Sequence, residues 1–461
     1  MAEDREKNTY EFALDSVPHA PPTIVPKSVA PEVWLLLDPD TPNWVVVDDI
    51  GKEIIGLISE TKSVREITTL LCEKYGGSYD ESAQNILAFV NDLGRRYFLR
   101  DDVFPEVEGI EWTIESFEEF WLHVTNQCNL RCKTCYVGSG LPFENELTAQ
   151  EIKNITDEAR ELGAKKMIIS GGEPFLRKDV LDILGHISEY FRRITFVTNG
   201  TLITEEIASN LSDYSNVMVQ VSLDGAREET NDCIRGKGSY RKTVRGIEHL
   251  VTAQVPCVIA MTLVKQNLNE ISEMVDLAKT FGLNHLHFPI LQVKGRAKES
   301  ESEVVPENES MVSAVKEIFK IPRTKGTAVS LSENFFQIIR AMQRKDLCGA
   351  GKQLISIAAD GRVYPCPGLH EDEFCAGSLL QHSLKEIYET GDIFNQLRSL
   401  CVLDIPECRP CEFRFICGGG CHVDRYHAYG HLKAPTPRCE AHQQIYSHLL
   451  VEEAKKFLSG G

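Results

Sequence analysis

The sequence lacks the features that would place the chain in a membrane or on a nucleic acid. No apolar run approaches the length of a membrane-spanning helix, and the N-terminal residues MAEDREKNTYEF are acidic, unlike a secretion signal. Positive charge is scarce, because 49 Lys and Arg residues stand against 68 Asp and Glu, a formal net charge of −19. Binding to DNA, RNA or anionic lipid needs clustered cations. We therefore expect a cytoplasmic protein with neither nucleic acid nor membrane as a partner.

Cysteine is abundant, with 15 in 461 residues. The cytoplasm keeps thiols reduced, so structural disulfides are not the expected use of these residues. Most of them fall in or beside two spaced sets, a pattern that indicates metal binding. The hydrophobic content of 42% and charged content of 25% are those of a globular protein, and the length predicts two or three domains.

The first set is the CxxxCxxC motif of Cys128, Cys132 and Cys135, which follows the apolar residues 120–124. Three thiolates can hold three irons of a [4Fe-4S] cube and leave the fourth iron open to a small molecule. Zinc is the alternative, but zinc sites need four tetrahedral ligands and this triplet has no fourth cysteine nearby. The motif therefore favours an iron–sulfur cluster with an open iron.

A turn of sequence Gly171-Gly172-Glu173-Pro174 follows a later apolar strand. Together with CxxxCxxC, it resembles the radical S-adenosylmethionine (SAM) enzymes, in which a reduced cluster cleaves SAM to a 5'-deoxyadenosyl radical. The resemblance implies that this turn receives the methionyl ammonium of SAM and that Glu173 accepts from it. It also implies SAM contacts for polar residues near the next strand ends: Asn199, Ser222, Asp224 and Arg235. The family often has an aromatic residue or His before the third cysteine, where this chain has Thr134.

Strands and helices alternate through the middle of the chain. Six strands are predicted, at residues 121–126, 166–170, 193–198, 217–223, 256–263 and 285–291. Such alternation predicts an α/β fold with a parallel sheet and right-handed crossovers. The resemblance implies a partial (βα)6 TIM-like barrel of radical SAM type, with its site at the C-terminal edge of the strands.

The N-terminal part predicts a winged-helix-like domain. Residues 33–37 and 44–47 read as a hairpin, and three helical patterns follow at 51–59, 63–75 and 80–97. The second helical pattern opens with a capping box, Ser63 to Glu66. This order resembles the PqqD-like domain that binds leader peptides of ribosomally made peptides, which implies that a leader strand adds to the hairpin edge. A plain docking domain stays open, whereas the acidic composition disfavours DNA reading.

The C-terminal part carries the second set of cysteines. Seven of them, with a Gly-x4-Cys unit, resemble the SPASM domain, and a zinc ribbon is the alternative. The resemblance implies one complete auxiliary [4Fe-4S] cluster on Cys408, Cys411, Cys417 and Cys439. It implies a second cluster on Cys348, Cys366 and Cys421, whose fourth ligand is Cys375, Cys401 or a substrate thiolate. We expect the remaining cysteines, Cys72, Cys233 and Cys257, to be core residues.

These patterns predict five segments. They are an N-terminal tail at 1–22, a recognition domain at 23–105, the partial barrel at 106–300, a linker or bridging region at 301–345, and the SPASM domain with a C-terminal helix at 346–461. The charged stretch 294–309 is expected to be a solvated linker or a mobile loop.

The resemblance predicts a maturase of a ribosomally synthesised peptide, in which the radical abstracts hydrogen and a cysteine sulfur is joined to a carbon as a thioether. Carbon–carbon crosslinking of side chains or another oxidative modification is the alternative, and a non-catalytic, metal-bound scaffold that docks peptides is the alternative of a different class. The implied cofactors are SAM and three [4Fe-4S] clusters. The implied partners are a precursor peptide and an electron donor such as ferredoxin or flavodoxin.

Overall fold

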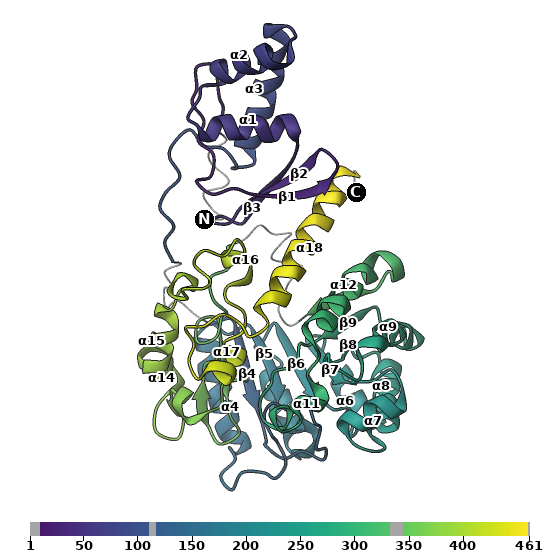
Figure 1. Cartoon of the computed structure of the whole chain (residues 1–461). Helices are drawn as coiled ribbons and strands as arrows, with labels where there is room; N and C mark the ends of the chain where they lie inside the picture. Colours follow the sequence, from purple (N-terminus) through teal and green to yellow (C-terminus); the bar gives the residue numbers. More distant parts are fainter. Residues whose placement is uncertain (1–9, 110–116, 332–343, 460–461) are drawn as a thin grey trace.

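The computed structural model describes residues 10–109, 117–331 and 344–459 of the chain. Figure 1 shows an N-terminal domain above a large α/β domain, with the C-terminal segments between and beside them. Within the described ranges, no helix is both long and apolar enough to cross a bilayer.

The N-terminal domain is a three-stranded antiparallel sheet with three helices. The predicted hairpin and helices are confirmed, and an additional edge strand, β1, pairs with β2. The capping box from Ser63 to Glu66 opens α2 as predicted. The elements are β1 (Val25–Ala30), β2 (Val33–Asp38), β3 (Asn43–Asp48), α1 (Asp49–Ser59), α2 (Val64–Tyr75) and α3 (Tyr79–Arg95).

This domain has its own hydrophobic core, formed where the apolar stripes of the helices meet the sheet. The segment before β1 takes part in it, because Phe12 is buried in that core and its backbone N–H donates to Asn91 Oδ1. A short antiparallel bridge joins His19 to Arg100. Of the expected tail, residues 10–22 therefore pack on the domain, and residues 1–9 lie outside the described part.

The large domain contains all six predicted strands, in order and parallel. Their apolar side chains form the main core with the intervening helices. The strands are β4 (Glu119–His123), β5 (Lys166–Ser170), β6 (Arg193–Thr198), β7 (Val217–Ser222), β8 (Cys257–Ala260) and β9 (His285–Phe288). The helices between them are α4 (Ala149–Glu161), α5 (Val180–Ile187), α6 (Glu205–Ser212), α7 (Glu228–Arg235), α8 (Ser239–Thr252) and α9 (Ile271–Thr280).

The sheet extends beyond these six strands at both ends. Strand β10 (Ala328–Leu331) pairs in parallel with β9, and β11 (Leu354–Ile357) pairs in parallel with β4. Two antiparallel strands, β12 (Arg362–Tyr364) and β13 (Gly377–Ser378), complete a sheet of ten strands. Since β11 to β13 belong to the cysteine-rich segment, that segment is anchored to the first strand of the barrel.

Residues 294–309 form short helices, although many of their charged side chains are exposed to solvent, so the expectation of a linker or mobile loop is wrong. They form α10 (Arg296–Glu299), α11 (Glu301–Val304) and the start of α12 (Asn308–Lys325). Ala297 and Val304 are buried in a small apolar cluster. The Arg296 guanidinium donates at 2.9 Å to the carbonyl oxygens of Cys132 and Ser139. These contacts hold the segment against the CxxxCxxC loop.

The rest of the cysteine-rich segment is mostly loops and short helices, closed by one long helix, as predicted. Figure 1 shows that long helix, α18, running up to β1 of the N-terminal domain, and the two are in contact. The helices are α14 (Leu384–Thr390), α15 (Asp392–Ser399), α16 (Arg414–Cys417), α17 (His422–Tyr429) and α18 (Cys439–Leu458).

Two ion pairs fasten the N-terminal domain to the loop between Cys411 and Cys417. Lys27 Nζ on β1 lies 2.9 Å from Glu412, and Asp40 in the β2–β3 turn pairs with Arg414. The Lys27 ammonium also lies 4.8 Å from the centroid of the Phe413 ring. Residues 412–414, which we call the clamp loop, therefore link the N-terminal domain to a cysteine-bearing loop.

Candidate active site

The barrel encloses a cavity of about 750 Å³. Each strand from β4 to β11 contributes at least one lining residue. Cys128, Cys132 and Cys135 all border this cavity, and so does Cys366 from the cysteine-rich segment. The fold therefore places cysteines of both predicted sets around one space.

Most of the predicted SAM contacts border the same cavity, namely Gly171, Gly172, Asn199, Ser222 and Arg235. The other three, Glu173, Pro174 and Asp224, are buried behind its wall. The structure thus gathers the predicted residues at one end of the barrel strands. Some of these residues border the cavity, and the others are buried and contact the residues that border it.

Gly171 and Gly172 pack closely against the backbone of the residues that precede the CxxxCxxC motif. A Cβ atom at Gly171 would lie 2.2 Å from the Thr125 carbonyl oxygen, and one at Gly172 would lie 2.1 Å from the Gln127 carbonyl oxygen. Gly171 also has φ of +127°, which side chains disfavour. Only glycines fit this contact, so the turn and the cysteine loop are held together through their backbones.

Glu173 uses its carboxylate to join two strand ends. It accepts hydrogen bonds from Thr198 Oγ1 at 2.7 Å and from the Asn199 backbone N–H at 2.8 Å. Burial raises the pKa of Glu173 to about 6, although these hydrogen bonds oppose the shift. The carboxylate therefore orients Asn199 at the cavity wall, and its contact with SAM stays a prediction.

The raised pKa of Glu173 predicts a pH-dependent stability. Because the folded pKa lies above the ordinary value of 4.5, Glu173 favours the folded state fully below pH 4.5, and this advantage is lost as pH rises through 6. A shift of this size corresponds to about 2 kcal/mol. In Glu173→Gln we expect a smaller fall in Tm between pH 5 and pH 7 than in the wild type, measured anaerobically without SAM. Equal falls in both proteins would contradict the assignment.

Asp224 and Arg235 form a buried ion pair beside the first cysteine set. Arg235 Nε lies 2.8 Å from Asp224 Oδ2, and its Nη1 lies 3.9 Å from Cys132 Sγ. Burial raises the pKa of the Cys132 thiol to about 11, while the Arg235 charge opposes the shift. A metal ligand must be a thiolate, so iron binding here releases a proton. Arg235 favours that thiolate, which fits an iron–sulfur cluster at this position.

Sequence analysis missed many of the residues that border the cavity, among them Arg296 and Tyr136. Arg296 borders the cavity and donates to the Cys132 carbonyl oxygen, but it lies in a charged stretch 164 residues further along the chain, and no sequence motif marks it. Tyr136 directly follows the third cysteine, and that position was the available signal. Burial raises the pKa of Tyr136, and the charges of Cys366 and Cys135 add to this, so its phenol interacts with one cysteine of each set.

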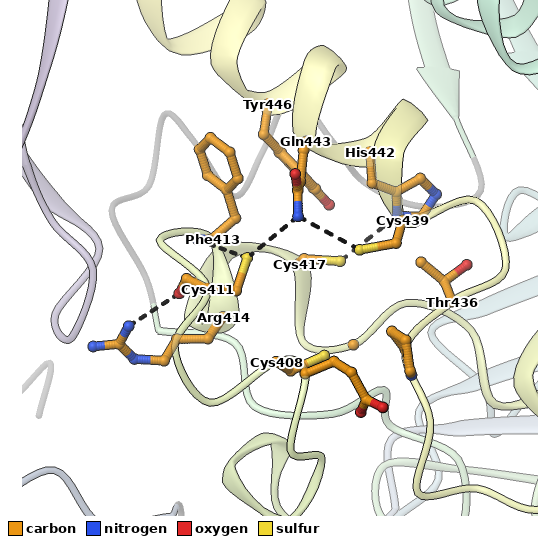
Figure 2. Close-up of a pocket in the computed structure, with 13 residues that line it drawn as sticks. Cys408, Cys411, Phe413, Arg414, Cys417, Thr436, Cys439, His442, Gln443 and Tyr446 are labelled. Atoms are coloured by element: carbon orange, nitrogen blue, oxygen red, sulfur yellow. Dashed lines mark hydrogen bonds between the residues drawn. The ribbon is translucent and has the colours of Figure 1, made fainter.

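Figure 2 shows the complete auxiliary set, in which four thiols converge on one hollow at the start of α18. His442 Nδ1 lies 3.6 Å from Cys417 Sγ, and Gln443 Nε2 donates to Cys439 Sγ at 3.6 Å. An iron-bound thiolate only accepts hydrogen bonds, so His442 would then be the donor. The converging cysteines are Cys408, Cys411, Cys417 and Cys439. This donor set, four thiolates with N–H groups beside three of them, fits a fully ligated cluster.

The second auxiliary set is also brought together. Burial raises the pKa of Cys366 to about 12, and the charge of Cys348 adds to this. Burial also raises the pKa of Cys421 far above its usual value, and the charges of Cys348 and Cys366 contribute. The three thiols therefore lie near one another, which fits three ligands of one cluster. Among the described residues, no three His, Cys, Asp or Glu side chains are grouped to hold a single metal ion.

The two candidate fourth ligands have other contacts. Cys375 Sγ donates to the Gly377 carbonyl oxygen at 3.5 Å, and Cys401 Sγ accepts from the Leu403 backbone N–H at 3.3 Å. Which group completes the cluster stays a prediction. Of the three cysteines expected in the core, Cys233 is exposed, so that expectation is wrong for it, and Cys72 and Cys257 are half-buried.

Three family models match the chain. The radical SAM superfamily matches residues 122–278, the coenzyme PQQ synthesis protein D (PqqD) matches 34–99, and the SPASM iron–sulfur cluster-binding domain matches 348–412. Each match lies within the corresponding segment predicted from the sequence. Together they cover most of the barrel and of the N-terminal domain, and the cysteine-rich segment up to residue 412.

Curated relatives resemble the chain over most of their own length. The mycofactocin maturase MftC of Mycolicibacterium smegmatis is 31% identical over 323 residues, which are 68% of this chain and 81% of that protein. An AdoMet-dependent heme synthase of Methanosarcina barkeri is 32% identical, covering 68% and 94%. The PqqA peptide cyclase of Bradyrhizobium diazoefficiens is 25% identical, covering 73% and 91%.

Two solved structures share the fold. Streptococcus suis SuiB bound to its precursor peptide SuiA has a TM-score of 0.60 at 15% identity and covers 92% of this chain and 100% of that chain. The enzyme anSMEcpe with bound AdoMet and Cp18Cys peptide has a TM-score of 0.60 at 20% identity, covering 74% and 99%. The predicted fold class is thereby confirmed.

The chain belongs to the radical SAM maturases that carry a SPASM domain. It is therefore an enzyme, and its cofactors are SAM and [4Fe-4S] clusters, as predicted. A non-catalytic scaffold, the alternative of a different class, is excluded by this membership.

Proposed function

We propose that the enzyme joins a cysteine sulfur of a ribosomally made precursor peptide to a carbon of the same peptide as a thioether. The observation that supports this most is that Cys366 of the three-cysteine set borders the same cavity as Cys128, Cys132 and Cys135. A peptide in this cavity can present a carbon to one cluster site and a sulfur to the other. Relatives named as a peptide cyclase and as a precursor-bound enzyme support a peptide substrate.

The residues around the cavity have different proposed roles. Bound to the first three cysteines, the cluster with SAM would supply a 5'-deoxyadenosyl radical, which takes hydrogen from an unreactive carbon. Asn199, held by Glu173, and Ser222 offer polar groups to the ribose and carboxylate of SAM. Cys348, Cys366 and Cys421 would hold a cluster with one iron left for the peptide sulfur.

The net change in the peptide replaces one C–H and one S–H bond by one C–S bond. The carbon loses its hydrogen to 5'-deoxyadenosine, and the thiol loses a proton. One electron enters from a donor such as ferredoxin or flavodoxin for the cleavage of SAM. One electron leaves the peptide when the bond forms, and the auxiliary clusters would accept it.

The N-terminal domain supports leader binding through β-augmentation at the outer edge of β3. The opposite edge of the sheet is β1, which contacts α18 and the clamp loop. Among the described residues, β3 pairs with β2 alone, so its other edge can accept a peptide strand. We propose that the leader binds there while the linked core peptide enters the barrel.

The test is mass spectrometry of a candidate precursor peptide, sought among short cysteine-containing reading frames beside the gene, after anaerobic incubation with enzyme, SAM and dithionite. Thioether formation predicts a loss of two hydrogens per crosslink and a cysteine that no longer reacts with an alkylating agent. The peptide with that cysteine changed to serine should stay unmodified, and the core peptide without its leader should react more slowly. Loss of two hydrogens with every cysteine still alkylatable would contradict the thioether and favour carbon–carbon crosslinking.

A further inference from the structure

Arg425 on α17 is a completely buried cation in the cysteine-rich segment. Its side chain has 0% exposure, so its charge is removed from water. Its Nη1 donates to the Leu432 carbonyl oxygen at 2.8 Å, and its Nη2 donates to His422 Nδ1. Burial, together with the Arg425 charge, lowers the pKa of His422 far below its usual value, so this imidazole is neutral and accepts. The two contacts satisfy hydrogen bonds but supply no negative charge.

Among the ion pairs of the described residues, none joins Arg425 to a carboxylate. The neighbouring Asp424 pairs with Arg438, at 3.0 Å, and Arg425 Nε has no hydrogen-bond partner. A buried guanidinium without a counter-charge is strongly unfavourable, so something anionic must face it. Burial lowers the pKa of Arg425, and the charges that oppose this are those of cysteine thiolates.

Those thiolates come from both auxiliary sets. Cys348 and Cys421 belong to the three-cysteine set, and Cys408 and Cys417 belong to the complete set. Gly419, between the two sets in sequence, is also close, since a Cβ built there would lie 3.4 Å from Arg425 Nη1. Arg425 therefore lies beside the loop that joins the two cysteine sets and interacts electrostatically with thiols of both.

We propose that Arg425 is the shared counter-ion of the two auxiliary clusters and raises the reduction potential of both. This rests on the assignment of the seven cysteines to two clusters. A thiolate-ligated [4Fe-4S] cluster gains negative charge on reduction, and a nearby buried cation stabilises that charge because the interior screens it weakly. The same cation makes each cluster a better acceptor for the electron that the peptide releases.

The test is a redox titration of the two clusters by electron paramagnetic resonance, without SAM or peptide. Cys128, Cys132 and Cys135 are changed to alanine in all proteins, so that only the auxiliary clusters give signals. Arg425→Met removes the charge, and Arg425→Lys keeps it. Arg409→Met is the matched control, because Arg409 lies between Cys408 and Cys411 but is exposed to solvent.

We expect both midpoint potentials to become more negative in Arg425→Met, while Arg425→Lys and Arg409→Met stay near the parent. Unchanged potentials in Arg425→Met, or an equal shift in Arg409→Met, would overturn the proposal. Loss of iron in Arg425→Met with retention of iron in Arg425→Lys also supports a counter-ion. Loss of iron in both variants would overturn the proposal, because it would show that Arg425 acts through its packing and not through its charge. Because no peptide is present, these outcomes are independent of thioether formation. An iron content of about eight per parent chain checks the cluster assignment separately.

Discussion

Replacing Cys128, Cys132 and Cys135 together by alanine is expected to lower 5'-deoxyadenosine formation by about 1,000-fold or more, because the three residues act as one unit. The same change should lower the iron content from about twelve to about eight per chain, since one of three [4Fe-4S] clusters is lost. Product chromatography after anaerobic incubation with SAM and dithionite measures the first effect, and iron analysis measures the second.

Cys72→Ala is the control for this triple variant, because Cys72 lies on α2 of the separate N-terminal domain. It should keep both the iron content and deoxyadenosine formation. If the triple variant retained about twelve irons and full turnover of SAM, then these three cysteines would not hold the SAM cluster.

Changing Cys366 to alanine is expected to separate SAM cleavage from crosslinking. The first cysteine set is untouched, so 5'-deoxyadenosine should still form on incubation with SAM and peptide. The crosslinked peptide should fall by about 100-fold, because the cluster that would hold the peptide sulfur loses one of its three protein ligands. The ratio of crosslinked peptide to deoxyadenosine, measured by mass spectrometry, gives the effect directly.

Cys375→Ala is the matched control, since its thiol contacts the Gly377 carbonyl oxygen. That variant should keep the wild-type ratio of product to deoxyadenosine. Equal loss of crosslinking in Cys375→Ala would identify Cys375 as the fourth ligand of this cluster. Full crosslinking in Cys366→Ala would contradict a role of this cluster in product formation.

The sequence predicted those helices and strands that have a clear apolar pattern or capping motif within their own residues. Strands β4 to β9 are apolar runs between helical patterns, and α2 begins at a capping box that the structure retains. Strand β1 was missed because its sequence, VPKSVA, is only weakly apolar and includes Pro26. Its pairing comes from β2, whose side chains form the core, so only the tertiary structure identifies it.

The cysteine-rich segment shows the same limit. Strands β11 to β13 are two to four residues long and carry no periodic signal, yet β11 extends the barrel sheet by pairing with β4. That pairing places Cys366 at the barrel cavity. A motif predicts which cysteines bind clusters, but it cannot predict that one of them faces the active site.

Residues of the candidate site could be predicted where a sequence motif falls at the end of a strand. Asn199 and Ser222 border the cavity, as their positions at strand ends suggest. Glu173 and Asp224 were predicted from the same motifs but are buried, one bound to Thr198 and the other to Arg235. The sequence indicates which polar residues lie near the site, whereas the hydrogen bonds of the folded structure determine which of them border the cavity.

The clamp loop has a consequence for how the protein is assembled in the cell. The N-terminal domain leaves the ribosome before the cysteine-rich segment does, since Glu412 lies 385 residues after its ion-pair partner Lys27. The clamp loop lies between Cys411 and Cys417, so we expect its shape to depend on the cluster that these cysteines are predicted to hold. We therefore expect the cluster to be inserted before the N-terminal domain docks on the clamp loop, so that metal insertion precedes domain docking.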